Sequence, residues 1–362
     1  MEFINLKAQY KEYKAEINQK IYEILESSRF IMGEYVSSFE RSLANYVGIK
    51  YAIGCSSGTD ALILALKALD IKKGDEVITS PFSFIASIEA ILLLGATPVF
   101  VDIDEKTYNL NPLLLKNAIT PKTKAIIPVS IFGQMASLIE INKIANGIPV
   151  IEDAAQSFGA SLVDNNKKYK SCNASFMATT SFFPSKPLGC YGDGGAIFCS
   201  DDELNDKLRC LVNHGQTKRY EHSFIGFNAR LDALQAGILD VKLKYLDSEI
   251  ALREQKAQYY NKHLENVITP FVENGHQSVY AQYSIRCKDR EKLINKLNKC
   301  KIPYAIHYPI PLHLQEVVRN LGIYKKGDFK ISEMICNEIL SIPFSPFITE
   351  EEQDKIIECI NG

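Results

Sequence analysis

One lysine of this sequence lies in surroundings that favour covalent chemistry. Lys186 stands between Pro184 and Pro187, just before Gly189 and a glycine-rich run at residues 192–195. Burial among apolar and rigid neighbours lowers the pKa of an amine and frees its lone pair to attack a carbonyl carbon. The glycine run does not match the spacing of a dinucleotide-binding loop, and as a plain turn it needs no ligand. The segment therefore predicts a lysine that binds a carbonyl compound covalently.

A second segment has the composition of an anion site. Residues 55–60, Cys-Ser-Ser-Gly-Thr-Asp, follow an apolar strand and open a helical pattern. The free N–H groups and the dipole at a helix start attract anions, Gly58 permits close approach of the backbone, and Thr59 adds a hydroxyl. The alternative is an ordinary helix cap, because serine and threonine are favoured there.

Two further residues follow predicted strands. Asp153 comes directly after an apolar run, where a carboxylate can face a ring nitrogen and keep it protonated, although aspartate is equally common in turns. Phe84 follows the strand at 76–79 and could stack on a flat ring, although an aromatic residue there is more often part of the core.

The elements that must position these residues alternate along the chain. Apolar runs without polar alternation are typical of strands buried on both faces of a mainly parallel sheet. Such sheets bind ligands at the carboxyl ends of their strands. The predicted strands are Tyr51–Cys55, Glu76–Thr79, Pro98–Asp102, Lys124–Val129, Pro149–Glu152, Phe176–Phe183 and Gly195–Ser200, and the predicted helices are Thr59–Leu69, Phe84–Leu94, Pro112–Ala118, Leu138–Ala145, one from about 201 and one over 232–266.

Composition bounds the class of protein. The 362 residues exceed one typical core, so we expect a large domain over residues 1–245 and a smaller C-terminal α/β domain over 246–362. A net charge of −2 argues against a nucleic-acid partner, and no apolar run is long enough to cross a membrane. The nine cysteines are scattered, which argues against a disulfide framework or a metal site, and with a non-secretory N-terminus this predicts a cytoplasmic protein.

The ordered motifs resemble those of the DegT/DnrJ/StrS family of sugar aminotransferases, which are fold-type I pyridoxal phosphate enzymes. The resemblance covers nearly the whole chain and is carried by the segments Gly58–Leu62, Ile151–Ser157, Ser181–Lys186 and Gly192–Ala196. It implies an α/β large domain with a mainly parallel seven-stranded sheet between helices. It also implies a homodimer with shared active sites.

The resemblance assigns a role to each matching residue. Lys186 should hold pyridoxal phosphate covalently and move protons, and relatives that dehydrate instead of transaminating have histidine there. Asp153 should pair with the pyridine nitrogen, Gln156 should lie near the ring hydroxyl, and Phe84 should stack on the ring. The phosphate should be held by Gly58, Thr59 and Ser181, with Asn228 reaching it from the partner subunit.

The acceptor is less sharply defined. The segments around residues 227–232, 278–283 and 305–312 look most like a subgroup that aminates the 3-keto carbon of UDP-linked 2-acetamido hexuronic acids for surface polysaccharides, with L-glutamate as donor. There the residues matching Arg230, His307 and Tyr308 line the acceptor site. Arg230 could instead pair with Asp232, and His307 could be structural. Two alternatives stay open: a small keto-phosphate such as dihydroxyacetone phosphate as acceptor in capsule synthesis, and a regulatory protein that binds the cofactor without turnover.

Overall fold

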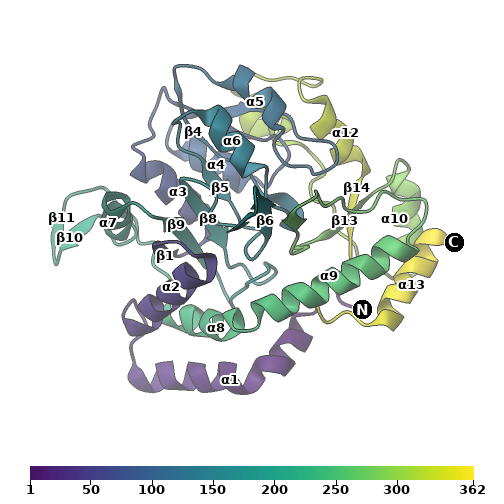
Figure 1. Cartoon of the computed structure of the whole chain (residues 1–362), viewed down its shortest axis with the longest axis horizontal. Coiled ribbons are helices and arrows are strands. Elements are labelled where there is room, and N and C mark those ends of the chain that lie inside the picture. Colours follow the sequence, from purple (N-terminus) through teal and green to yellow (C-terminus); the bar gives the residue numbers. More distant parts are fainter.

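A seven-stranded sheet forms the centre of the molecule in the computed structural model, which describes residues Met1–Gly362 (Figure 1). Two groups of strands, β1-β9-β8-β5 and β3-β2-β4, are joined by parallel bridges from Ile126 to Val150 and from Val129 to Asp153. Only β9 runs antiparallel to its neighbours, so the predicted mainly parallel α/β sheet is confirmed. The strands are β1 Tyr51–Cys55, β2 Glu76–Thr79, β3 Thr97–Phe100, β4 Thr123–Ile126, β5 Ile151–Asp153, β8 Met177–Ser181 and β9 Gly195–Cys199.

Both faces of this sheet are covered, which explains its apolar sequence. Successive side chains of a strand point to opposite faces. Ala52 accordingly packs in one apolar cluster and Ile53 in another, and Phe198 and Ile197 divide in the same way. The helices that connect and cover the strands are α3 Gly58–Ala68, α4 Ala86–Leu93, α5 Pro112–Ala118, the short 3-10 helix η1 Ile131–Gly133, α6 Leu138–Ala145 and α7 Asp202–Leu211.

The N-terminal helices, α1 Leu6–Ser27 and α2 Glu34–Val47, pack against α8 Ala233–Leu243 along one side of the molecule (Figure 1). The single long helix predicted over 232–266 is wrong, because α8 is separated from α9 Leu246–His263. The N–H groups of Lys244 and Tyr245 bond to carbonyls three residues back, at 3.3 and 3.1 Å, which tightens the chain into a turn.

The C-terminal part has a core of its own. Strand β13 Tyr283–Arg286 pairs with β14 Ile339–Ile342, and their apolar side chains pack with α9, α10 Arg290–Lys299 and α13 Glu350–Asn361. The first turns of α9 contribute Leu246 and Ile250 to the core of the large sheet, whereas Tyr260 belongs to the C-terminal core. The division after residue 245 stays a prediction. The remaining elements are β6 Ser161–Asp164, β7 Lys167–Lys170, β10 Gln216–Lys218, β11 Glu221–His222, β12 His276–Gln277, η2 Leu312–Leu314, α11 Glu316–Arg319 and α12 Lys330–Glu338.

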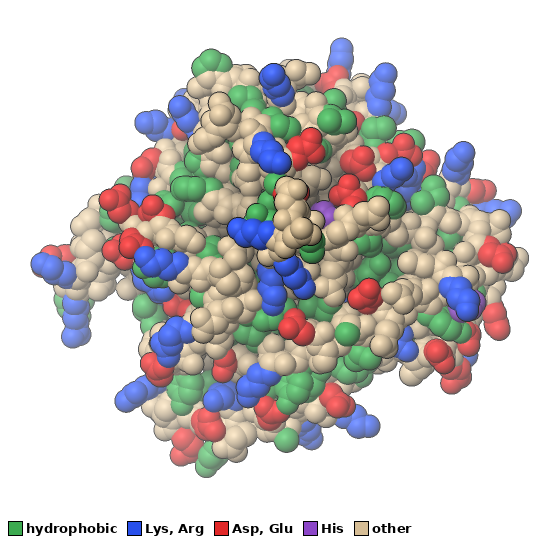
Figure 2. Space-filling model, in the orientation of Figure 1, with side chains coloured by type: hydrophobic (Ala, Val, Ile, Leu, Met, Phe, Trp, Pro, Cys, Tyr) green, Lys and Arg blue, Asp and Glu red, His purple; other side chains and the backbone are tan.

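Cys300 and Cys359 are joined in a disulfide that links the end of α10 to α13, a pairing that the scattered cysteine spacing did not predict. The other seven cysteines are free, and most of them are buried. No helix combines the length and the apolarity that crossing a bilayer requires. Basic and acidic side chains are interspersed over the face shown in Figure 2, in keeping with the net charge of −2.

Asp102 connects the large sheet to the C-terminal part. Its carboxylate, just beyond β3, accepts hydrogen bonds at 3.0 Å from the backbone N–H groups of Ile331 and Ser332 in the first turn of α12. The hydroxyl of Ser332 adds a third, at 2.6 Å. Because these N–H groups lack partners within the helix, Asp102 acts as a cap supplied from a distant part of the chain.

We expect Asp102→Ala to lower the free energy of unfolding by about 1–2 kcal/mol, the usual cost of removing a helix cap. Denaturant titration followed by circular dichroism measures this loss. Asp102→Asn keeps one acceptor oxygen and should lose less. An unchanged midpoint for the alanine variant would contradict the capping role.

Candidate active site

A cavity of about 480 Å³ opens where the carboxyl ends of the strands meet the C-terminal part. Its lining comes from the loops after β1, β2, β4, β5 and β8, from Gln282 just before β13 and from the segment after α10. Nine residues singled out from the sequence line it: Gly58, Thr59, Phe84, Asp153, Gln156, Ser181, Lys186, His307 and Tyr308.

Lys186 and Asp153 are electrostatically coupled within this cavity. Burial lowers the pKa of the Lys186 amine, and the charge of Asp153 partly opposes that shift. Burial also raises the pKa of Asp153. Hydrogen bonds from the Ala155 N–H at 3.1 Å and the Ser87 hydroxyl at 3.3 Å partly oppose that rise. The Lys186 loop is closed by the Lys186 N–H, which donates to the carbonyl of Phe183 at 2.9 Å. The cavity thus holds an amine that loses its proton readily beside a carboxylate.

The start of α3 is capped and still offers free donors. Ser57 is the cap, since its hydroxyl oxygen accepts from the Asp60 N–H at 3.0 Å. The N–H groups of Gly58 and Thr59 have no partner within the helix and lie at the cavity. A Cβ on Gly58 would lie 2.6 Å from the Cβ of Ser181, so only glycine lets the helix start approach the end of β8. The cap and the anion site are therefore separate features of one segment.

Gln156, Tyr308 and Phe84 form a second group. The Gln156 carbonyl oxygen accepts from the Phe132 N–H at 2.7 Å, and its amide nitrogen donates to the Tyr308 hydroxyl at 3.2 Å. The rings of Tyr308 and Phe84 are 6.1 Å apart. Because α4 begins at Ala86 and not at Phe84, the Phe84 ring stays in the loop, 55% exposed at the cavity, whereas Phe82 is the buried core residue.

His307 is held by a chain of hydroxyls. Its Nδ1 lies 2.9 Å from the Ser341 hydroxyl, which is 2.8 Å from that of Ser284. Burial and the positive charge of Lys186 both lower the pKa of His307, which favours the neutral imidazole. Burial raises the pKa of Tyr308, so its phenol stays protonated and can donate a hydrogen bond.

Asn228 and Arg230 do not line the cavity of their own chain. Asn228 is exposed, and the guanidinium of Arg230 donates to the side-chain oxygen of Asn213 at 2.8 Å. The alternative in which Arg230 pairs with Asp232 is not observed, because no carboxylate lies within ion-pairing distance. Their roles toward a partner subunit stay predictions.

The model of the DegT/DnrJ/EryC1/StrS aminotransferase family matches residues 11–361. The chain belongs to this family.

Relatives and solved structures agree with this membership. A UDP-2-acetamido-2-deoxy-3-oxo-D-glucuronate aminotransferase of Pseudomonas aeruginosa is 49% identical over 352 residues, 96% of each chain. An aminotransferase of the same family from Brucella abortus is 40% identical, with a TM-score of 0.95 over 100% of this chain and 99% of its own. NtdA from Bacillus subtilis, solved with bound cofactor PMP, is 32% identical, with a TM-score of 0.89 over 97% and 81%.

The protein is therefore a pyridoxal phosphate-dependent sugar aminotransferase, as the motifs predicted. The cavity fits this cofactor. The start of α3 with the Thr59 and Ser181 hydroxyls suits a phosphate, Lys186 suits an aldehyde, and the Asp153 carboxylate suits a protonated ring nitrogen.

A buried carboxylate beside the candidate active site was not predicted from the sequence. Glu152 is completely buried and accepts hydrogen bonds from the hydroxyls of Ser130, Ser157 and Ser171, at 2.8, 3.3 and 2.9 Å, and from the Cys172 N–H at 2.8 Å. Strand alternation turns Glu152 away from the face of Asp153. An acidic residue in an otherwise apolar strand was the available signal, but three of its four donors, Ser130, Ser171 and Cys172, lie about 20 residues away in sequence.

We expect Gly58→Ala to weaken cofactor binding at least about tenfold, because relief of the clash with Ser181 moves the start of α3 by more than the site tolerates. Titration of the apo-protein with pyridoxal phosphate, followed by visible absorbance, measures the affinity. Gly147→Ala, in the remote loop after α6, is the control: its φ of 94° strains an alanine, so this variant should lose stability and leave the affinity unchanged. Equal affinities for both variants would contradict the proposed phosphate seat.

Proposed function

We propose that this enzyme transfers the amino group of L-glutamate to the 3-keto carbon of a UDP-linked 2-acetamido hexuronic acid, in the synthesis of a bacterial surface polysaccharide. The observation that carries the proposal is the 49% identity, over 96% of both chains, to the Pseudomonas aeruginosa enzyme that bears this substrate in its name. The cavity of about 480 Å³ is large enough for a cofactor with part of a sugar, while the nucleotide would extend outward.

The residues of the cavity divide the work by their chemistry. Bound pyridoxal phosphate supplies an electron sink through which an amino group leaves one carbon and later joins another. Lys186 would hold the cofactor between turnovers and then move a proton at the reacting carbon, and its lowered pKa favours the neutral amine that can accept this proton. Asp153 would accept a hydrogen bond from the ring nitrogen and stabilise the positive charge there. Gln156 and Phe84 would orient the ring.

In this proposal, His307 and Tyr308 form the part of the cavity wall that contacts the acceptor sugar. Both line the cavity, and the neutral His307 and protonated Tyr308 can hydrogen-bond to sugar hydroxyls. Arg230 supplies a planar cation that matches a carboxylate or a phosphate with two parallel hydrogen bonds.

We further propose that Asn228 and Arg230 of each subunit act in the cavity of the other subunit. The enzyme is then an obligate homodimer. Both residues lie outside the cavity of their own chain, which supports this role. Large apolar side chains that a partner could cover lie close to Asn228 in sequence, with Tyr220 80% and Ile225 84% exposed.

The shared site is tested by complementation between two inactive variants. In a heterodimer of Lys186→Ala and Asn228→Ala subunits, one cavity carries both substitutions and the other carries neither. We therefore expect about half of the wild-type activity per dimer, although each variant alone is weak or inactive. Two different affinity tags isolate the heterodimer. Activity no higher than the mean of the two parent variants would contradict a contribution from the partner.

The acceptor is tested with a panel of ketones, including UDP-linked 3-keto 2-acetamido hexuronate and dihydroxyacetone phosphate. We expect 2-oxoglutarate to form from L-glutamate at least about a hundredfold faster, judged by kcat/KM, with the sugar nucleotide. Lys186→Ala is the control and should lose both turnover and the visible absorbance of the bound cofactor.

Two outcomes would contradict the proposed acceptor. Brisk turnover of dihydroxyacetone phosphate without turnover of the sugar nucleotide would assign the enzyme to keto-phosphate chemistry. A yellow protein that no amino donor converts to the amine form would favour the regulatory alternative.

A further inference from the structure

Gln282 has an unpaired polar atom in the wall of the active-site cavity. The residue is only 9% exposed and lines both this cavity and a small neighbouring one of about 20 Å³. Its side-chain oxygen is buried and has no hydrogen-bond partner. The great majority of buried polar atoms in proteins are paired, so an unpaired one beside a ligand cavity indicates a partner that arrives with the ligand. The two ends of a carboxamide are interchangeable by rotation, so the group can offer either an acceptor or a donor.

Gln282 lines the same cavity as His307. It directly precedes β13, and it lines the small neighbouring cavity together with Ser284. The Ser284 hydroxyl pairs with that of Ser341, which in turn holds His307. Gln282 and His307 therefore belong to one wall, built from the C-terminal part of the chain, of the cavity that Lys186 also lines.

We infer that Gln282 recognises the 2-acetamido group of the acceptor sugar, an inference that rests on the proposed function. In a 3-keto sugar the carbon that bears this group is bonded directly to the reacting carbon. When the reacting carbon lies within proton-transfer distance of the Lys186 amine, the acetamido group on the neighbouring carbon must therefore lie against the cavity wall. The cavity wall there has to accept an N–H and donate to a carbonyl oxygen.

A carboxamide side chain can both accept a hydrogen bond from the N–H and donate one to the carbonyl oxygen. An acetamido group has one N–H donor and one carbonyl acceptor, and glutamine presents the complementary pair. A hydroxyl at the same carbon could use only one of the two. Gln282 accordingly sets the preference for a 2-acetamido sugar over its 2-hydroxy counterpart, a choice that the proposed roles of His307, Tyr308 and Arg230 leave open.

The experiment compares wild-type enzyme with Gln282→Leu, which keeps a similar volume and removes both hydrogen-bonding atoms. The acceptors are UDP-linked 3-keto 2-acetamido hexuronate and the same molecule with a 2-hydroxyl. We expect kcat/KM for the acetamido acceptor to fall about ten- to a hundredfold and kcat/KM for the hydroxy acceptor to change less than about threefold. The half-reaction with L-glutamate, followed by the cofactor spectrum, should stay unchanged.

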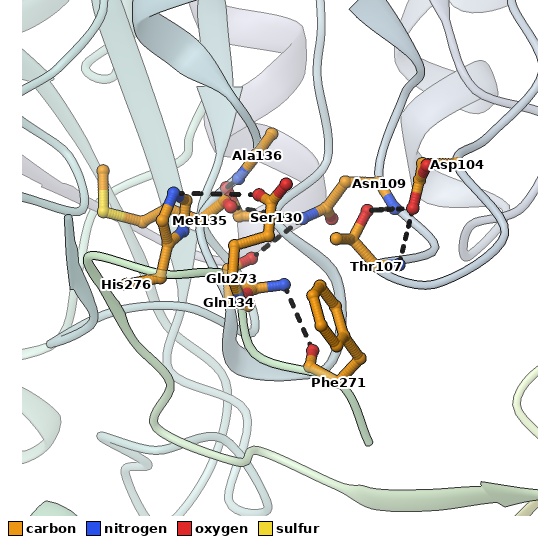
Figure 3. Close-up of polar contacts among 10 residues, drawn as sticks. All are labelled: Asp104, Thr107, Asn109, Ser130, Gln134, Met135, Ala136, Phe271, Glu273 and His276. Carbon is orange, nitrogen blue, oxygen red and sulfur yellow. Dashed lines mark hydrogen bonds and ion pairs between the residues drawn. The ribbon is translucent and has the colours of Figure 1, made fainter. Parts of the chain in front are cut away.

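Gln134→Leu is the matched control. Gln134 lines the same small cavity as Gln282, but both ends of its carboxamide have hydrogen-bond partners. Its oxygen accepts from the Glu273 N–H at 2.7 Å, and its nitrogen donates to the Phe271 carbonyl at 3.5 Å, a contact drawn in Figure 3. We expect this variant to lose thermal stability and to keep the wild-type preference between the two acceptors.

The possible results distinguish a failure of this inference from a failure of the proposed function. Equal losses with both acceptors for Gln282→Leu would overturn the inference and leave Gln282 a structural residue. A slower glutamate half-reaction would also overturn it, because Gln282 would then serve the cofactor or the donor. If wild-type enzyme aminates neither sugar nucleotide, the proposed function itself fails.

Discussion

The meeting of a buried amine and a buried carboxylate at one end of the sheet is the constraint on which the active site depends. Removal from water disfavours the charged forms of both Lys186 and Asp153, and each charge partly restores the other. Neither group could be kept in this state on the surface, where water would return both to their ordinary pKa values. The covered sheet, with helices on both faces, therefore provides chemistry as well as stability.

Glu152 shows how the fold supports this arrangement from behind. It lies next to Asp153 in β5 and is completely buried on the opposite side, with four hydrogen bonds from three separate loops. An unpaired buried carboxylate costs several kcal/mol. Loss of any of these hydrogen bonds is therefore unfavourable, and Glu152 holds the three loops in place. One of these loops carries Ser130, whose N–H bonds to the carbonyl of Asp153 at 3.0 Å. The network thereby sets the position of the catalytic strand end.

The C-terminal part closes the cavity and carries the residues proposed to choose the acceptor. Tyr308 reaches Gln156 across 152 positions of sequence, and His307 is tied to β13 and β14 through Ser284 and Ser341. The large sheet holds the groups suited to a cofactor, whereas the C-terminal wall supplies groups suited to a substrate.

The sequence by itself determined the sheet, the lysine and the order of the cavity residues. The strands β1, β2, β8 and β9 lie within the predicted ranges, because uninterrupted apolar runs and glycine turns are local signals. Gly58 and Asp153 were found because they lie at or just beyond the ends of such runs, and Lys186 was found because prolines and glycines surround it. Only the tertiary structure decided the break between α8 and α9, the pairing of Cys300 with Cys359, the donors of Glu152 and the unpaired carboxamide of Gln282. The break between α8 and α9 is a local turn that the continuous helical pattern conceals. The disulfide and most of the donors of Glu152 depend on atoms brought together from distant positions, and no spacing within the chain records such distances.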